Sequence, residues 1–165
     1  MRFMRTATTI AFALVATMAV AQDRMSPQDF ATMAASSDMF EIESSQLALQ
    51  KSQSDDLKQF AQQMIDDHTK ASADLKAAAA QDGVTVPAAM TDKHASQVEM
   101  LKGVSGDAFD VAYAGAQLAA HQEGLDLMQS YAGNGESPAL KAHAAKSAPI
   151  IEAHLRHVEA MGTKK

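Results

Sequence analysis

The feature that most constrains the fold is a set of four long segments in which apolar residues recur at steps of three and four. Residues at this spacing lie on one face of an α-helix. The sequence contains no run in which apolar and polar residues alternate as they do in a half-buried strand. The pattern therefore predicts an all-α protein. The stripe of the second segment is Leu57, Ala61, Met64, Ala71 and Leu75, and that of the third is Val111, Ala114, Leu118, Leu125 and Met128.

Start and stop signals delimit these segments. Ser26-Pro27 and Ser137-Pro138 each offer an N-cap residue followed by proline at the first helical position. Ser54 can cap another helix, which Asp82-Gly83 would end. The signals predict long helices over about 27–51, 55–82, 106–132 and 138–161, with a short helix over about 92–103.

The lengths of the connections indicate the topology. The links at about 52–54 and 133–136 are short, whereas the connection between the second and third long helices is long. Two helical hairpins joined by one long crossover form a ferritin-like bundle. We therefore expect a ferritin-like up-down four-helix bundle whose crossover contains a short extra helix, with both short links at the same end. Pro149 falls inside the last helix and should kink or divide it.

The first residues have the pattern of an export signal. Arg2 and Arg5 precede an apolar run over 10–20 that is too short to span a bilayer, and Ala19-Val20-Ala21 fits a cleavage site. We expect residues 1–21 to be a signal peptide cleaved after Ala21, and residues 22–165 to form one domain. The expected location is the periplasm, with association at the outer membrane as a further option. The chain has no cysteine, which excludes disulfides, thiolate metal sites and a lipoprotein anchor.

Charge and motifs narrow the functional classes. The formal net charge is −6 at pH 7, which argues against binding to nucleic acid. After the expected signal peptide, the sequence has no apolar run that is long enough for a transmembrane span. The sequence has no phosphate-binding glycine loop, nucleophile elbow or His-Glu-x-x-His motif, so an enzyme is not the favoured interpretation. A protein partner and the oligomeric state stay open.

Four ionisable residues stand where the helical stripes call for leucine: Glu43, His68, His121 and His154. Burying such groups is costly unless they pair with one another, with water or with a metal. Depth in the bundle can be counted along each helix from the short links, at about 1.5 Å per residue. This count places Glu43, His68 and His121 at the same depth and His154 about one turn deeper. Glu41 is expected to point elsewhere. Solvent exposure is expected for Asp66, Asp67, His94, His143 and His157.

Two functions follow from these four residues. The principal prediction is a non-catalytic exported bundle, related to the cell envelope or to stress, in which they form a hydrogen-bonded polar layer. The alternative is a metal-binding protein that uses Glu43, His68, His121 and His154 as ligands of a single zinc, copper or iron ion. A di-iron centre is not expected, because Ile65 and not glutamate stands three residues before His68. Met64, one turn before His68, is a weaker signal for copper.

Several short motifs, spread over about residues 30–161, occur in an order that resembles a known family. The family is the bacterial domain of unknown function 4142, whose members are exported, ferritin-like helical domains labelled as outer-membrane or periplasmic proteins. The resemblance implies a ferritin-like fold and export, and it implies no particular activity. The motifs are Phe40-Glu41-Ile42-Glu43, Leu57-Lys58-Gln59-Phe60-Ala61, Met64-Ile65-Asp66-Asp67-His68, Gly83-Val84, Phe109-Asp110-Val111-Ala112-Tyr113, Ala120-His121 and Glu152-Ala153-His154-Leu155.

Overall fold

The computed structural model describes residues 24–162, and all secondary structure within that range is helical. This confirms the predicted all-α class. The predicted signal peptide lies outside the described residues. The helices are α1 (Pro27–Lys51), α2 (Asp55–Gln81), α3 (Asp92–Lys102), α4 (Asp107–Asn134) and α5 (Pro138–Gly162).

The predicted caps start three of these helices. The Ser26 hydroxyl accepts a hydrogen bond from the backbone N–H of Asp29 at 3.0 Å, directly before α1. The Ser54 hydroxyl accepts one from the N–H of Leu57 at 3.3 Å, before α2. The Ser137 hydroxyl does the same for Leu140 at 3.2 Å, before α5. Each bond satisfies an N–H that the helix leaves free at its first turn.

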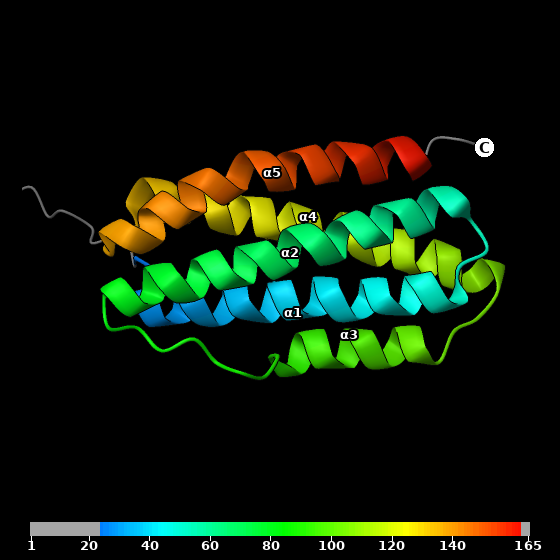
Figure 1. Ribbon diagram of the computed structural model, residues 1–165, viewed down its shortest axis with the longest axis horizontal. Coiled ribbons are helices and arrows are strands. Elements are labelled where there is room, and N and C mark those ends of the chain that lie inside the picture. The colour runs from blue at the N-terminus through cyan, green and yellow to red at the C-terminus, as the bar shows by residue number, and fades with distance from the viewer. Residues whose placement is uncertain (1–23, 163–165) are drawn as a thin grey trace, which may run out of the picture.

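The four long helices form a bundle of two antiparallel hairpins, α1–α2 and α4–α5 (Figure 1). The crossover, which contains α3, runs along the bundle, so that α4 starts at the end where α1 stops (Figure 1). The ferritin-like topology is thus confirmed. The expectation that both short links lie at one end is wrong, because a crossover along the bundle puts them at opposite ends.

Contacts at each end fix this arrangement. At one end the Lys51 ammonium donates to the carbonyl oxygens of Leu101, Lys102 and Val104, at 3.2, 2.6 and 2.9 Å. These bonds tie the end of α1 to the end of α3. At the other end the Ser137 hydroxyl donates to the Asp82 carboxylate, which ties the start of α5 to the end of α2.

Large aromatic side chains fill the core between the hairpins. Phe30, Phe40, Phe60 and Phe109 are fully buried, and the Phe30 ring stacks on Tyr131 with 3.9 Å between centroids. In α4 the inward face differs from the predicted stripe, since Val111 and Leu118 are 75% and 42% exposed. Burying Phe109 and Tyr113 removes more apolar surface from water than burying Val111 and Leu118 would, and this sets the rotation of α4.

Pro149 does not interrupt α5, which runs as one helix from Pro138 to Gly162. Its side chain is exposed, so the bundle interior is packed by other residues of the helix. Of the two predicted outcomes, a division of this helix is therefore wrong.

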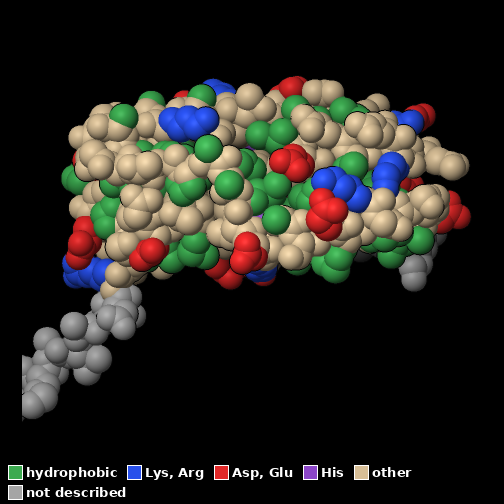
Figure 2. Space-filling model, turned by 90° about the horizontal axis from the view of Figure 1, so that it is seen from below, with side chains coloured by type: hydrophobic (Ala, Val, Ile, Leu, Met, Phe, Trp, Pro, Cys, Tyr) green, Lys and Arg blue, Asp and Glu red, His purple; other side chains and the backbone are tan. Residues whose placement is uncertain are grey.

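The outer surface has mixed polarity on the face seen from below in Figure 1. Acidic and basic side chains are interspersed there with small apolar and polar ones, and they do not gather by sign (Figure 2). None of the helices within residues 24–162 is long and apolar enough to cross a membrane.

Candidate metal centre

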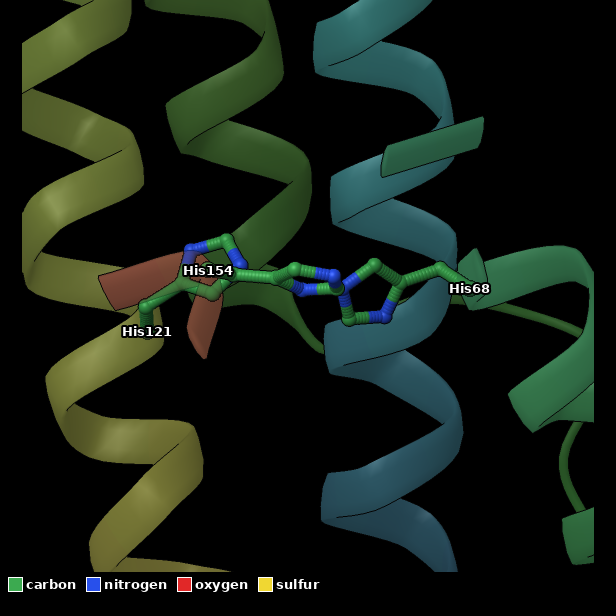
Figure 3. Close-up of side chains that lie close together, drawn as sticks. All are labelled: His68, His121 and His154. Atoms are coloured by element: carbon green, nitrogen blue, oxygen red, sulfur yellow. The ribbon is translucent and has the colours of Figure 1, made fainter. Parts of the chain in front are cut away.

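Three histidines from three helices meet in the middle of the bundle (Figure 3). His68 comes from α2, His121 from α4 and His154 from α5, and their side chains are buried. One ring nitrogen from each lies within 4.8 Å of those of the other two. The ring centroids are 5.4 to 5.8 Å apart. The structure brings the three predicted histidines together at one level, so the expected deeper position of His154 is wrong.

Each imidazole has one ring nitrogen fixed by an oxygen atom. His68 Nδ1 lies 2.8 Å from Asp38 Oδ1, His121 Nδ1 lies 2.9 Å from the Gln117 carbonyl oxygen, and His154 Nε2 lies 2.9 Å from Asp67 Oδ2. Carbonyl and ionised carboxylate oxygens only accept hydrogen bonds, so these three nitrogens are the N–H donors. The tautomer of each neutral ring is thereby set.

The other nitrogen of each ring carries a lone pair and has no hydrogen-bond partner among the described residues. These atoms are Nε2 of His68, Nε2 of His121 and Nδ1 of His154, and all three are buried. A buried polar atom without a partner costs on the order of 1–3 kcal/mol. A metal ion satisfies all three lone pairs at once, and metal-binding histidines typically donate their other N–H to an oxygen, as these do.

A carboxyl group lies behind each of the three rings. Asp38 and Asp67 bind His68 and His154, and Glu41 Oε1 lies 3.6 Å from Nδ1 of His121. Glu41 is 1% exposed, and its Oε2 has no hydrogen-bond partner in the described part of the chain. Burial raises the pKa of the Glu41 carboxyl to about 7, although the charge of His68 acts in the opposite direction.

Glu43 is exposed on the outer side of α1, so its predicted place in the buried layer is wrong. The carboxyl that faces the histidines is Glu41, two residues earlier. The inward face of α1 includes Asp38, Glu41, Ser45 and Ala48, at steps of three and four. The Ser45 hydroxyl is 2.8 Å from the Tyr113 hydroxyl of α4, which holds this face inward.

The bonds of Asp38 and Asp67 to the clustered histidines were not predicted from the sequence. Asp38 continues the stripe of Phe30, Ala34, Ser45 and Ala48 at steps of three and four, and that stripe is the signal that would have found it. The Asp67 side chain is 40% exposed, and its carboxylate reaches across to α5. The expected solvation of Asp67 is therefore only half right.

The three remaining histidines are not members of this cluster. His143 is 6% exposed, which corrects its expected solvent exposure, and its Nε2 is another buried nitrogen without a partner among the described residues. His94 is partly buried, with Nδ1 2.6 Å from the Ser36 hydroxyl. His157 is exposed as predicted, with its ring edge against Phe60.

The environment divides the three central histidines into two types. Burial lowers the pKa of His121 to about 3, and the neighbouring His68 adds to this effect. Burial also lowers the pKa of His154, with partial compensation by the hydrogen bond to Asp67. For His68 burial again acts to lower the pKa, but the bond to Asp38 and the charge of Glu41 outweigh it and the pKa is raised. His68 is therefore the ring that protonates most readily.

The fold has relatives among solved structures. A fragment of a DUF305 protein from Deinococcus radiodurans is 12% identical with a TM-score of 0.71, covering 82% of this chain and 93% of its own. CopM in its Cu(II)-bound form is 20% identical with a TM-score of 0.70, covering 84% of this chain and 96% of its own. The Cu(I)-bound form of CopM is 19% identical, with a TM-score of 0.68 and the same coverage. At these identities the similarity establishes the helical-bundle fold.

Sequence comparison adds one family. The family model described as domain of unknown function (DUF4142) matches residues 13–161. No sequence among curated proteins matches the chain.

Proposed function

The chain belongs to the DUF4142 family, a domain of unknown function, and we propose that it binds a single transition-metal ion through His68, His121 and His154. The observation that carries this proposal is the set of three buried lone-pair nitrogens, which lack hydrogen-bond partners among residues 24–162 and belong to rings that meet in the bundle centre. The ligands are Nε2 of His68, Nε2 of His121 and Nδ1 of His154. Glu43, exposed on α1, is not among them.

The surrounding charges suit a bound cation. Taking an ion out of water is costly unless opposite charges lie close to it. Asp38 and Asp67 stand behind two of the rings, and Glu41 stands behind the third. Asp38 and Asp67 orient two of the imidazoles and the Gln117 carbonyl oxygen orients the third. Nearby carboxylates offset the positive charge of the ion, as the second layer of a metal site does.

Copper is the metal that we propose. Neutral imidazole suits copper, zinc, iron and nickel, and thioether sulfur favours copper among them. Met64 is fully buried one turn before His68, and Met128 is buried on α4. The copper-bound forms of CopM, which share the bundle fold, give copper further support over zinc. Zinc is the competing metal.

The predicted signal peptide suggests where the site acts. Cleavage after Ala21 and export to the periplasm would leave the bundle of residues 22–165 in a compartment outside the cytoplasm. In our proposal the protein is a non-catalytic binding protein that holds copper there. A hydrogen-bonded polar layer without metal is the competing function, and it is supported by the hydrogen bond that each of the three rings already makes.

Metal content decides between these two functions. The protein is purified without a histidine tag, stripped with a chelator, exposed to one equivalent of copper or zinc, and desalted before elemental analysis. We expect one copper per chain, a preference for copper in competition with zinc, and loss of bound copper in His68→Ala and His121→Ala. The matched control is His157→Ala, because His157 is exposed and is not one of the three clustered histidines.

The competing polar-layer function gives a different result. It predicts a wild-type protein that retains no stoichiometric metal while the two alanine variants lose stability. Equal loss of copper in His157→Ala and His121→Ala would also count against the proposed site.

A further inference from the structure

The three proposed ligand atoms lie in a closed part of the bundle. Nε2 of His68, Nε2 of His121 and Nδ1 of His154 have almost no surface that solvent can reach. A cavity of about 120 Å³ between α2 and α5 reaches His68 and His154 but not His121. Asp38 and Asp67, which accept from the N–H groups of the first and third rings, also line it. The cavity therefore adjoins the N–H sides of these rings, and a water molecule in it does not face the lone pairs.

Side chains of the described residues supply no fourth nitrogen or oxygen ligand at this point. The cluster of groups that could hold a metal consists of the three histidines, without a carboxylate or a further imidazole. Glu41 Oε1 is 3.6 Å from Nδ1 of His121, which is the N–H donor of that ring, so Glu41 also lies on the N–H side. A metal ion at the three lone pairs therefore has three nitrogen ligands and is shielded from water.

Coordination number separates the candidate ions. Zinc in proteins is almost always four-coordinate, and water takes the fourth position where the protein supplies three ligands. Cu(II) in nitrogen and oxygen sites adopts a square-planar or tetragonal arrangement, which needs at least four ligands. Cu(I) has a filled d shell that imposes no such geometry, and three ligands satisfy it. A closed site with three imidazoles therefore suits Cu(I) best.

Two methionines on the same helices favour the same ion. Met64 of α2 and Met128 of α4 are buried, and thioether sulfur is a soft ligand that selects Cu(I). We propose that the three-histidine site holds its copper as Cu(I), shielded from water, and selects this ion over Cu(II) and zinc. This inference rests on the proposed function, to which it adds the oxidation state of the metal.

The reduction potential of the bound copper tests the inference. The chain is loaded with one copper ion without oxygen, and elemental analysis confirms the loading. The potential is then measured by redox titration, with the electron paramagnetic resonance signal of Cu(II) as the readout. We expect Cu(I) to be favoured about 100-fold or more relative to the aqueous couple, which raises the potential by about 120 mV at 59 mV per tenfold. X-ray absorption of the reduced form should show three nitrogen ligands at about 2 Å.

A pair of isoleucine substitutions on α5 tests the role of the shielding. Ile151 lines the cavity, and its Cδ1 lies 3.8 Å from the position that a Cβ atom of Gly124 would take, one turn beyond His121 on α4. Ile151→Ala should open a path from the cavity to the lone pairs and admit water. The preference for Cu(I) should then fall about tenfold or more, which lowers the potential by about 59 mV. The neighbouring Ile150 is 44% exposed, so Ile150→Ala should keep the wild-type potential.

The possible failures are distinguishable. If the wild type binds neither Cu(I) nor Cu(II), the proposed function itself is wrong, and the inference is wrong with it. If copper is bound but its potential is not raised, or if the reduced form has a fourth oxygen or nitrogen ligand, the inference is overturned and the metal site stands. Equal potentials in Ile151→Ala and Ile150→Ala would also overturn it. Should Ile151→Ala fail to fold, the potential and the ligand number of the wild type still decide.

Discussion

Nδ1 of His68 donates a 2.8 Å hydrogen bond to Oδ1 of Asp38, and both side chains are buried between α1 and α2. The bond fixes the ring so that Nε2, the atom with the free lone pair, points towards the rings of His121 and His154 (Figure 3). It also raises the pKa of His68 against the opposing effect of burial. Asp38 therefore governs both the direction and the basicity of one proposed ligand.

Replacing Asp38 tests this relationship. In Asp38→Asn the ring loses a charged acceptor, and we expect copper affinity to fall by about 10- to 100-fold. Affinity is measured by competition with a chelator of known strength. Asp66→Asn is the control, because Asp66 is exposed on α2 and accepts a hydrogen bond from the exposed Gln62. Equal affinities in the two variants would show that Asp38 does not orient a ligand.

The pH dependence of metal binding should reflect His68. A protonated imidazole cannot bind a metal, and the pKa of His68 is raised while those of His121 and His154 are lowered. As the pH falls through the pKa of His68, affinity should fall about tenfold per pH unit, with one proton competing per ion. Isothermal titration in buffers of different ionisation enthalpy measures the protons released. The measurement is made in Glu41→Gln, which removes the other group that titrates near neutral pH. A release of two or three protons at neutral pH in that variant would contradict this assignment.

The Glu41 carboxyl should make the protein less stable as the pH rises. Its pKa is raised from 4.5 to about 7, so the folded state binds more protons than the unfolded state between those values. Stability is therefore lost across that window and levels off above it. Glu41→Gln should remove this loss, and its unfolding free energy relative to wild type should rise by up to about 3 kcal/mol between pH 4.5 and 8.

Glu43→Gln is the matched control for this experiment, since Glu43 is the exposed glutamate two residues away on α1. Urea unfolding at several pH values provides the free energies. The unfolding free energy of Glu43→Gln should follow the wild-type pH profile. A profile of Glu41→Gln that is parallel to the wild type would mean that this carboxyl does not titrate between pH 4.5 and about 7 in the folded protein.

The helix boundaries and topology could be predicted because their signals are local. Serine caps, prolines at first helical positions and glycine stops act over one turn, and most of the observed bounds agree with them. The three histidines could be found because each interrupts an apolar stripe. That the three rings lie at the same depth in the bundle could not be derived. It depends on the position of one hairpin along the other, and on the short links being at opposite ends.

The carboxyl groups were harder to predict, for a physical reason. Apart from Phe30 and Phe40, the inward face of α1 is built from alanine, serine and acidic residues, so it has little apolar contrast with the outward face. Glu41 and Glu43 are two residues apart and therefore on different faces. Which one turns inward depends on contacts between helices, such as that of Ser45 with Tyr113. Asp67 reaches His154 between helices, a contact that no spacing within one helix encodes.

Pro149 gives a prediction for stability that is independent of the metal. It lies on the exposed side of an uninterrupted α5, where it removes a backbone N–H from the helix. Pro149→Ala should stabilise the protein by about 1–3 kcal/mol, as measured by urea or thermal unfolding. Lower stability in this variant would indicate that the core depends on the helix shape that the proline imposes.

Anomalous diffraction from crystals of the copper-loaded protein tests most directly whether His68, His121 and His154 bind one copper ion. We expect one strong copper peak per chain, about 2 Å from Nε2 of His68, Nε2 of His121 and Nδ1 of His154. A fully loaded crystal with its copper at another group of residues, or with the three ring nitrogens bonded only to water or to one another, would contradict it.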